Sequence, residues 1–379
     1  MLIAKKVRLL PTPEQESLFW QSAGTARWAY NYGISRIQEA RETSNEILFV
    51  SDIRKEVTKL KKTEEYAWLK NVSANVPKQA LIELNTAFSR MKDGSGYPKY
   101  KKKHGSRISF YVTYETLTKT DKGFTGEKLG EVLTSEPLPV LPEGEKYSRP
   151  TISFDGKFWY LSVGYNRDFV KESGLEGILS IDLGLKDLAT VAKDRQDFAV
   201  FTNINKSRRV RVLEKRLKKL QRKFSKAQKG SKNKEKLRRK IQEIYRTLRN
   251  IRDNHNHQMT SFLVKTKPEM IVTETLQIQK MMKNKQLAKS ISDVKWYDIL
   301  RQLRYKCEKY GITMIQVDPY YASSKICSNC GHKKPHLGLE EREYICEECG
   351  FEAGRDQNAT YNLHDEGLRI YNEMLATLG

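Results

Sequence analysis

The sequence predicts a multidomain α+β protein that carries a small metal-binding module. Three observations support this fold class. Helical apolar spacing fills residues 13–98, strand-like alternation occupies 108–170, and short apolar strands alternate with helices from residue 177. Two Cys-x-x-Cys pairs stand near the C-terminus. A length of 379 residues allows two or three domains, and changes in composition indicate where they join.

The first part of the chain combines one strand with a long helical tract. Residues 2–10 alternate like an edge strand, and the prolines at 11 and 13 open the helices. The apolar residues on one face of the first helix are Phe19, Ala23, Ala26 and Tyr30. Glycines and a proline at 94–98 end the tract.

The next part is rich in strands. A basic linker over 99–107 precedes it, and residues 152–163 have the pattern of a β-hairpin around a type I′ turn at Asp155-Gly156. We expect these strands and strand 2–10 to form one small barrel that the helical tract interrupts.

Carboxylates follow the buried strands of the α/β part. Residues 178–181 form an apolar strand that ends at Asp182, and residues 270–272 form another that ends at Glu274. Asp356 begins a helical segment further along. Because functional groups gather at the carboxyl ends of such strands, we expect the three acids to converge.

Asp182, Glu274 and Asp356 together offer what a nuclease site with two metal ions requires. In-line cleavage of a phosphodiester with two ions about 3.5–4 Å apart needs several carboxylates. Mg²⁺ prefers such oxygen ligands and retains water molecules. A single acid usually only solvates the surface, so the prediction depends on all three standing at these positions. The sequence therefore predicts a Mg²⁺ site.

The four cysteines near the C-terminus predict a structural zinc site. They are Cys327, Cys330, Cys346 and Cys349. Each Cys-x-x-Cys pair offers two thiolates to one edge of a tetrahedral ion, and four thiolates leave no open position for substrate. The alternative is two disulfides in a secreted protein, but no secretory start is seen. Cys307 falls in a helical pattern and is expected in the core.

A strongly basic stretch predicts a helical hairpin that binds phosphates. Residues 206–249 hold twenty lysines and arginines against three glutamates, and the hairpin is expected to span 206–252. Leucines and isoleucines at helical spacing lie on both sides of a break near 229–233. A solvated charged face is the usual alternative, but such faces interleave acids, which are scarce here.

The overall charge indicates nucleic acid as the partner. The formal net charge is +23, more than solubility requires. A membrane surface would also attract such charge, but the sequence has no transmembrane-length apolar run and only a short apolar start before Lys5. We expect a cytoplasmic protein without a membrane partner.

Three motifs resemble those of the TnpB family, the RNA-guided nucleases of bacterial insertion sequences that are related to type V CRISPR effectors. The motifs are residues 181–187 (Ile-Asp-Leu-Gly-Leu-Lys-Asp), 271–276 (Ile-Val-Thr-Glu-Thr-Leu) and 355–363 (Arg-Asp-Gln-Asn-Ala-Thr-Tyr-Asn-Leu). Residues 281–284, 287–293 and 323–331 are also similar to family signatures. The resemblance covers nearly the full length and implies that Asp182, Glu274 and Asp356 are the catalytic acids.

The resemblance also implies a domain plan. Residues 1–12 and 99–176 would form a wedge-type β-barrel, with 13–98 inserted as a helical recognition domain. Residues 177–322 and 354–379 would form an RNase H-like RuvC α/β domain, with the zinc module inserted at 323–353. A guide RNA from the transposon end would read double-stranded target DNA by base pairing, with one protein chain per guide RNA.

Candidate nucleic-acid contacts follow from this plan. The phosphate-binding candidates are Lys101, Lys102, Arg208, Arg209, Arg211, Lys215, Lys218, Lys219 and Arg222. The protein would read only a short duplex motif beside the target. The candidate motif readers are Ser51, Arg54, Asn75, Lys78, Gln79, Thr113 and Tyr114.

The chain departs from the family pattern at three positions. Thr275 stands where an acid or amide is common, Thr360 replaces an alanine, and Gly354 stands where an acid often precedes Arg355. None of these changes removes a metal-binding acid. Two alternatives to a nuclease remain open, a guided DNA-binding repressor without cleavage and a DNA-strand transferase.

Overall fold

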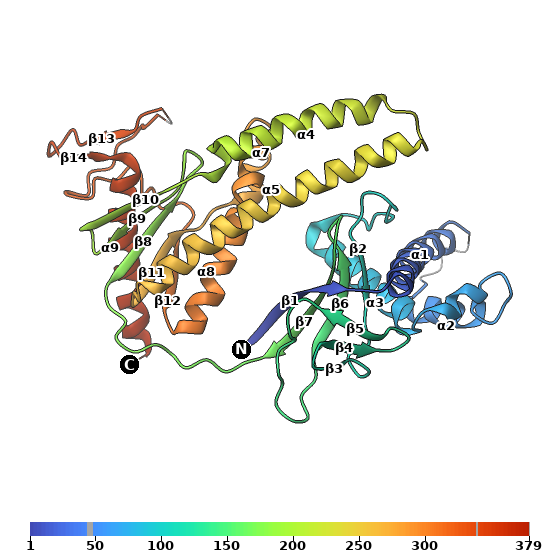
Figure 1. Ribbon diagram of the computed structural model, residues 1–379. Coiled ribbons are helices and arrows are strands. Elements are labelled where there is room, and N and C mark those ends of the chain that lie inside the picture. Colours follow the sequence, from blue (N-terminus) through green and yellow to red (C-terminus); the bar gives the residue numbers. More distant parts are fainter. Residues whose placement is uncertain (44–47, 339, 379) are drawn as a thin grey trace. The chain divides into compact units, whose positions relative to one another are not determined.

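The computed structural model describes residues 1–43, 48–338 and 340–378, and the chain divides into two compact units (Figure 1). The units are Met1–Arg167 and Asp168–Gly379. Their division falls inside the segment 99–176 that the sequence assigns to the wedge. The finer domain plan stays a prediction, while a multidomain mixture of helices and sheets is confirmed.

The first unit holds one sheet, and all of its described helices lie between the first two strands along the chain. Its elements are β1 (Leu2–Leu10), α1 (Pro13–Thr43), α2 (Val50–Leu60), η1 (Ala67–Asn71), α3 (Asn75–Arg90), η2 (Met91–Ser95), β2 (Ile108–Tyr111), β3 (Thr118–Lys119), β4 (Gly123–Gly126), β5 (Gly130–Thr134), β6 (Ser148–Phe154) and β7 (Trp159–Asn166). The seven strands are ordered β2-β6-β7-β1-β5-β4-β3. Within the described residues β2 and β3 do not pair, so hydrogen bonding does not close the expected barrel.

The core of this unit confirms the helical face predicted from the sequence. All four residues of the α1 face are buried, and Phe19 is fully enclosed. Its ring lies edge-on to Trp159 of β7, with ring centroids 5.3 Å apart. The α1 stripe therefore covers the sheet, as apolar residues at helical spacing predict.

The hairpin between β6 and β7 is confirmed, but its turn lies one residue further along than expected. Phe154 pairs with Trp159, and Asp155 N donates to Phe158 O at 3.1 Å. The Asp155 carboxylate accepts from Lys157 N and Phe158 N. Asp155 thus closes the strand and caps the turn, so Gly156 and Lys157 form the tip instead of Asp155-Gly156.

The second unit is an α/β layer structure with the four-cysteine segment, the predicted zinc module, near its end. Its elements are β8 (Ile178–Leu183), β9 (Asp187–Lys193), β10 (Asp197–Thr202), η3 (Ile204–Lys206), α4 (Arg208–Lys226), α5 (Lys232–Lys265), β11 (Met270–Glu274), α6 (Ile278–Met281), α7 (Ala288–Val294), α8 (Trp296–Tyr310), β12 (Thr313–Val317), β13 (Glu343–Ile345), β14 (Glu352–Gly354) and α9 (Arg355–Leu378). The sheet order is β10-β9-β8-β11-β12. Within the described ranges, no helix combines the length and the apolar character needed to cross a bilayer.

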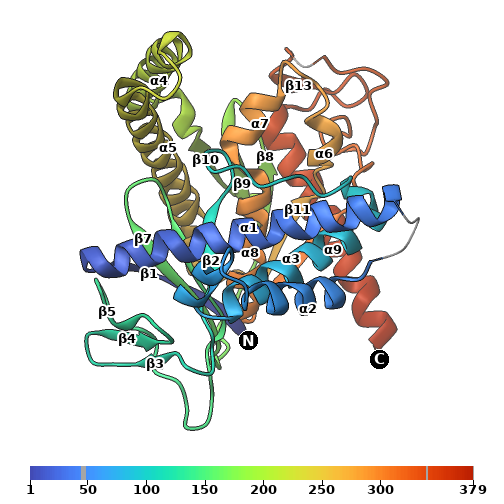
Figure 2. The same cartoon turned by 90° about the vertical axis from the view of Figure 1, so that its right-hand side faces the viewer.

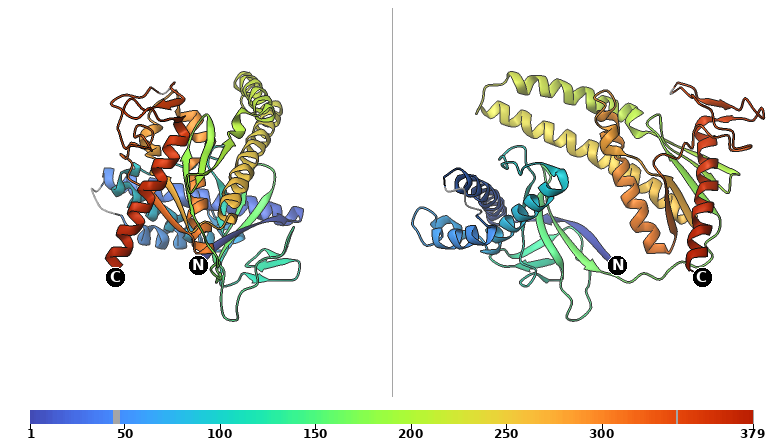
Figure 3. Two further views of the ribbon diagram at one scale, coloured as in Figure 1. Left: turned by 90° about the vertical axis from the view of Figure 1, so that its left-hand side faces the viewer. Right: turned by 180° about the vertical axis from the view of Figure 1, so that it is seen from behind.

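Alternation along the strands assigns different helices to the two faces of this sheet. Leu179, Ile181 and Ile271 pack with residues of α5 and α8. Met270 and Val272, one position away in β11, pack with Leu363 of α9 instead. Successive side chains of a strand point to opposite faces, so α5 and α8 cover one face and α9 covers the other (Figure 3).

The basic stretch forms the predicted helical hairpin, in which α4 and α5 run side by side (Figure 1). Leu217 of α4 and Leu248 of α5 are buried in the seam between the two helices. Ser207 and Ser231 cap the two helices by accepting from Val210 N and Lys234 N. The second helix continues to Lys265, well past the expected end at 252.

Candidate metal and nucleic-acid sites

Parallel pairing of β8 and β11 brings two of the predicted acids to one edge of the sheet. Ile181 lies opposite Thr273 in this ladder, and Asp182 and Glu274 follow directly on each strand. Side chains separated by an even number of positions along a strand point to the same face of the sheet. Asp182 therefore lies on the same face as Ile178, and Glu274 on the same face as Val272. Both Ile178 and Val272 pack on the α9 side, so both carboxylates lie on the α9 face.

The third acid stands in the first turn of the helix that covers this face. Asp356 is the second residue of α9. The helix lies close to β11, because a Cβ at Gly367 would overlap the side chain of Val272. Leu363 is fully buried against the same strands. This packing holds the first turn of α9 near the carboxyl end of β8.

The pKa shifts show that these carboxylates act on one another. Burial raises the pKa of Asp182 well above its usual value, and the charges of Glu274 and Asp356 raise it further, while Arg355 opposes them. Burial also raises the pKa of Glu274 to about 7. All three side chains keep partial exposure, so the acids form a cluster of like charge that remains open to solvent.

The donor set of this cluster fits Mg²⁺. Within the described residues, none of the three acids has an ion pair or a side-chain hydrogen bond. Carboxylate oxygens without a cationic partner are the ligands that hard divalent ions prefer. In the described ranges these acids do not converge as closely as the four thiols do.

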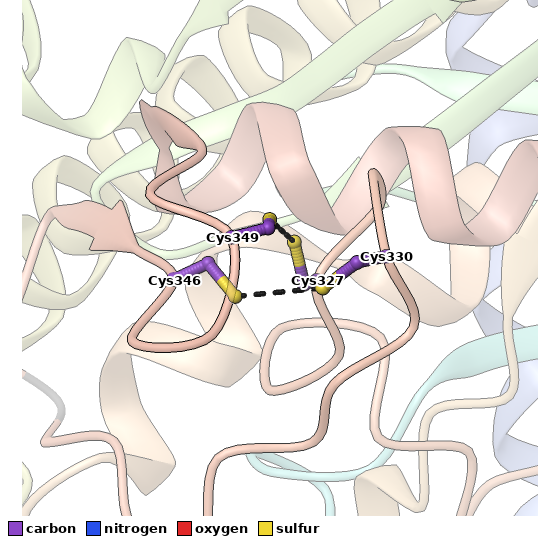
Figure 4. Close-up of side chains that lie close together, drawn as sticks. All are labelled: Cys327, Cys330, Cys346 and Cys349. Carbon is purple, nitrogen blue, oxygen red and sulfur yellow. Dashed lines mark hydrogen bonds between the residues drawn. The ribbon is translucent and has the colours of Figure 1, made fainter.

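The four cysteines converge as the sequence predicts, and Figure 4 shows their side chains pointing toward one another. Their sulfur atoms all lie within 4.8 Å of one another. Cys327 Sγ is 3.7 Å from Cys349 Sγ, and Cys330 Sγ is 3.6 Å from Cys346 Sγ. Four thiolates around zinc at 2.3 Å would be about 3.8 Å apart, whereas disulfide sulfurs are about 2 Å apart. The spacing fits zinc, and the structure joins none of the four cysteines in a disulfide.

The two cysteine turns have the same backbone geometry. Gly331 N donates to Cys327 O at 2.9 Å, and Gly350 N donates to Cys346 O at 3.0 Å. Both glycines have a positive φ, 79° and 72°, which a side chain would strain. Each Cys-x-x-Cys-Gly segment is therefore a preformed knuckle whose geometry is set locally.

Two asparagines that the sequence analysis did not select tie the zinc module to α9. Asn358 Oδ1 accepts from Ser328 N at 3.0 Å, and Asn358 Nδ2 donates to Ile326 O at 2.7 Å. Asn362 Nδ2 also donates to Ile326 O at 2.7 Å. Both amides are buried. Their spacing of four residues on a helix that carries Asp356 is the signal that could have identified them.

The predicted phosphate-binding residues differ in their surroundings. The seven arginines and lysines chosen from α4 are all exposed, and within the described residues none has an ion pair. Lys102 is also exposed. Lys101, in contrast, pairs with Glu83 at 3.1 Å and lies over the Tyr30 ring, 4.0 Å from its centroid. The α4 surface is thus the more available one for phosphates.

Four of the candidate motif readers gather at one cavity of the first unit. Ser51 and Arg54 of α2 and Asn75 and Lys78 of α3 line a cavity of about 590 Å³. Lys55 and Lys61, which the sequence analysis did not select, also line it.

The other three candidate readers lie outside this cavity lining. They are Gln79, Thr113 and Tyr114. Thr113 is buried and accepts from Asn75 Nδ2 at 2.9 Å, so it is better placed to orient Asn75 than to touch a base. Tyr114 is exposed. Motif reading by any of the seven stays a prediction.

Comparison with known structures shows which fold these sites belong to. The chain in a cryo-EM structure of a Cas12f1–sgRNA–target DNA complex matches with a TM-score of 0.54 at 16% sequence identity. The match covers 96% of this chain and 98% of that one. The protein therefore shares the multidomain fold of this effector class.

Comparison of sequences identifies the family. A putative RNA-guided DNA endonuclease of Streptomyces pristinaespiralis is 32% identical, covering 96% of this chain and 89% of the relative. The putative RNA-guided DNA endonuclease InsQ of Escherichia coli K12 is 27% identical, covering 97% and 93%. The chain belongs to the TnpB family of insertion-sequence proteins, as the motifs predict.

Family models match three parts of the chain. A model described as a probable transposase matches residues 171–285, and one described as a Cas12f1-like TNB domain matches 296–363. A model described as a helix-turn-helix domain matches residues 1–46, of which the described part forms β1 and the single helix α1.

Proposed function

We propose that this chain is an RNA-guided, Mg²⁺-dependent DNA endonuclease of an insertion sequence. It would cut double-stranded DNA next to a short flanking motif. The observation that carries the proposal is the cluster of Asp182, Glu274 and Asp356 at one sheet edge, where burial and then the charges of the other two acids raise the pKa of Asp182. Two relatives that match nearly the whole chain are named putative RNA-guided DNA endonucleases, and these names support the same activity.

The three acids would hold two Mg²⁺ ions, and the rest of the site would keep them in place. When bound, the ions supply charge stabilisation and a water nucleophile for in-line hydrolysis. Asp182 and Glu274 are anchored by a shared parallel ladder, so their separation is set by the sheet. Asp356 is positioned by α9, and the buried Asn358 of the same helix is hydrogen-bonded to the backbone of the zinc module. The zinc would be structural, because four thiolates close its shell.

A guide RNA and the target DNA would be held mainly by charge. The exposed basic face of α4 lies on a hairpin whose two helices share a buried apolar seam, and within the described residues this face has no ion pairs. These features suit binding to an RNA or heteroduplex backbone. Base pairing with the guide would read the target sequence. We propose one protein chain per guide RNA.

The test separates chemistry from binding. Asp182→Ala, Glu274→Ala and Asp356→Ala should each abolish Mg²⁺-dependent cleavage while guided DNA binding stays nearly intact, because affinity resides in basic contacts. Glu269→Ala is the matched control, since Glu269 lies just before β11, at the opposite end of the strand from Glu274. Retained cleavage in any of the three variants would refute the assignment.

Two other activities give different products. A guided repressor would bind the target without cutting it when guide and Mg²⁺ are present. A strand transferase, which the probable-transposase description favours, would join DNA ends, whereas hydrolysis leaves free ends. Sequencing the ends of the reaction products distinguishes all three activities.

Motif reading would fall to the cavity between α2 and α3. A randomised flanking-sequence cleavage library with alanine variants at Asn75, Lys78 and Thr113 tests this role. Loss of a base contact should relax preference at one motif position at a cost of about 1–3 kcal/mol. Lys102→Ala should instead weaken binding to all sequences. Thr113 lies outside the cavity lining and would act by orienting Asn75. An unchanged motif profile in all three variants would assign motif reading elsewhere.

A further inference from the structure

The turn between β9 and β10 holds an arginine in an unfavourable backbone conformation. A hydrogen bond from Gln196 N to Lys193 O at 2.9 Å closes the turn, and its central residues Asp194 and Arg195 have φ values of 48° and 61°. Such a turn favours Asn, Asp or Gly, because other side chains strain the left-handed region. Asp194 also fixes the turn to β8, since its Oδ1 accepts from Ile178 N at 2.7 Å. A strained arginine at a fixed turn points to a function of its side chain.

The Arg195 guanidinium joins two other segments of the second unit. One nitrogen donates to the carboxylate of Asp365 in α9 at 3.0 Å, and another donates to the backbone carbonyl of Ser328 at 2.8 Å. The guanidinium carbon lies 5.3 Å from the centroid of the Tyr361 ring, also in α9. Because both hydrogen bonds come from one planar group, moving either segment away breaks a charge-assisted hydrogen bond. Arg195 thus clamps α9 and the segment around Ser328 to the β9–β10 turn.

Ser328 belongs to the first cysteine knuckle. It directly follows Cys327 and is buried. Its N–H donates to Asn358 Oδ1 and its carbonyl accepts from Arg195, so hydrogen bonds hold this residue from both sides. Figure 2 shows the zinc module, marked by β13, at the amino end of α9. The knuckle is therefore fixed between the helix and the turn.

The residues of α9 that meet this knuckle and its clamp share one face of the helix. Asn358, Tyr361 and Asp365 follow one another at i, i+3 and i+7. Asn358 lies in the first turn of α9, two residues after Asp356. A continuous path of hydrogen bonds therefore runs from the β9–β10 turn through Ser328 to the helical turn that carries Asp356.

We propose that Arg195 is a positioning residue for the carboxylate site. It acts through Ser328 and Asn358, because a knuckle held against α9 fixes the place of Asp356 relative to the sheet that carries Asp182. The inference rests on the proposed function and adds to it a residue outside the acids and the cysteines. Residues that orient metal ligands without touching the metal typically contribute about 10–100-fold to metal affinity or activity. We expect an effect of this size at both metal sites.

Arg195→Gly is the decisive variant, because glycine removes the side chain and also suits the positive φ of the turn. Circular dichroism and thermal unfolding should show that the variant is folded at the assay temperature. Zinc release to a chelator, followed with a metal dye, should be about tenfold faster than in the parent. Arg369→Ala is the control and should release zinc at the parental rate, since Arg369 pairs with Glu366 and Glu373 of its own helix.

The carboxylate site is tested with Mn²⁺ as the probe, because Mn²⁺ takes the same oxygen ligands as Mg²⁺. An EPR titration, with Asp182→Ala as the blank, should show about tenfold weaker Mn²⁺ binding in Arg195→Gly. In single-turnover cleavage with guide and target, the rate constant should fall while the fraction of target that is cut stays parental. A merely structural loss would do the reverse, because unfolded molecules lower the amplitude and leave the rate constant of the folded ones unchanged.

A double-mutant cycle tests the path from α9 to the knuckle. Asp365→Ala should speed zinc release in the parent, because the Arg195 guanidinium loses the carboxylate that holds it in place. The same change should add nothing in the Arg195→Gly background, since Asp365 acts through Arg195.

Four outcomes would overturn the inference. Arg195→Gly could keep the parental zinc release, or it could keep the parental Mn²⁺ affinity while zinc release speeds up, which would limit Arg195 to the zinc module. Arg369→Ala could change both readouts as much as Arg195→Gly does, or Asp365→Ala could have its full effect without Arg195. A parent that binds Mn²⁺ at the acids but cuts no DNA would refute the proposed nuclease, and the zinc and Mn²⁺ measurements would still decide the role of Arg195.

Discussion

Lys306 of α8 is a buried lysine whose charge the fold disfavours. Its ammonium donates to Thr260 Oγ1 at 2.7 Å, Ser261 Oγ at 2.8 Å and His257 O at 3.1 Å, all on α5. Within the described residues it has no acidic partner. Burial, with a smaller effect of Lys309, lowers the pKa of Lys306 to about 8.

This shift makes the stability of the protein depend on pH in a defined direction. Between about pH 8 and pH 10.5, the unfolded chain keeps the Lys306 proton while the folded chain loses it, so the free energy of unfolding rises with pH. From pH 7 to pH 10 the lowered pKa corresponds to a gain of about 2.5 kcal/mol. Lys306→Met has no proton to release, so its stability should lack this gain.

The assay is urea unfolding followed by circular dichroism at several pH values between 7 and 10. The difference in free energy of unfolding between the parent and Lys306→Met cancels the titration of all other groups. We expect this difference to shift in favour of the parent by about 2.5 kcal/mol across the range. A difference that stays constant with pH would refute the conclusion that burial lowers this pKa.

Elemental analysis should find about one zinc per chain, and Cys346→Ser should release it and loosen residues 325–353. Asn358→Ala should cost about 1–3 kcal/mol by leaving the buried Ser328 N–H unpaired, and chelators should then remove zinc faster, as a metal-dye assay would detect. Gly367→Ala should destabilise the protein by about 1–3 kcal/mol through overlap with a β11 side chain. Gly24→Ala, in a helix with open space around it, should stabilise by about 0.4–1 kcal/mol, and thermal unfolding compares the two.

Several elements were predictable because their signals are local. Apolar spacing in α1 and in the α4–α5 seam corresponds to the buried faces that the structure shows. Cys307 is buried in α8, as its position in a helical pattern predicts. The expected end of the hairpin at residue 252 was wrong, because polar residues that follow it are buried in the protein. Asn256 stands in a polar stretch that suggests the end of a helix, yet its amide donates to Val294 O inside the protein, and α5 continues to Lys265.

Two strands of the five-stranded sheet escaped the sequence analysis for a related reason. β12 follows α8 after only a short turn at Gly311, and β10 is an edge strand that pairs on one side only within the described sheet. Short strands depend on their neighbours for stability, so their own residues carry a weak signal. The three acids were identifiable, in contrast, because each follows or begins an element with a clear pattern.

The sequence by itself determined the chemistry that this protein can offer. Thiol pairs at knuckle spacing, acids at strand ends and a basic hairpin are local features, and local geometry sets them. The tertiary structure alone decided that Asp182 and Glu274 share a face and that α9 brings Asp356 to it. Convergence needs β-strand register and side-chain parity, and both arise from pairing between segments far apart in the chain. The same packing lets Asn358 of α9 accept a hydrogen bond from the backbone of the first cysteine knuckle.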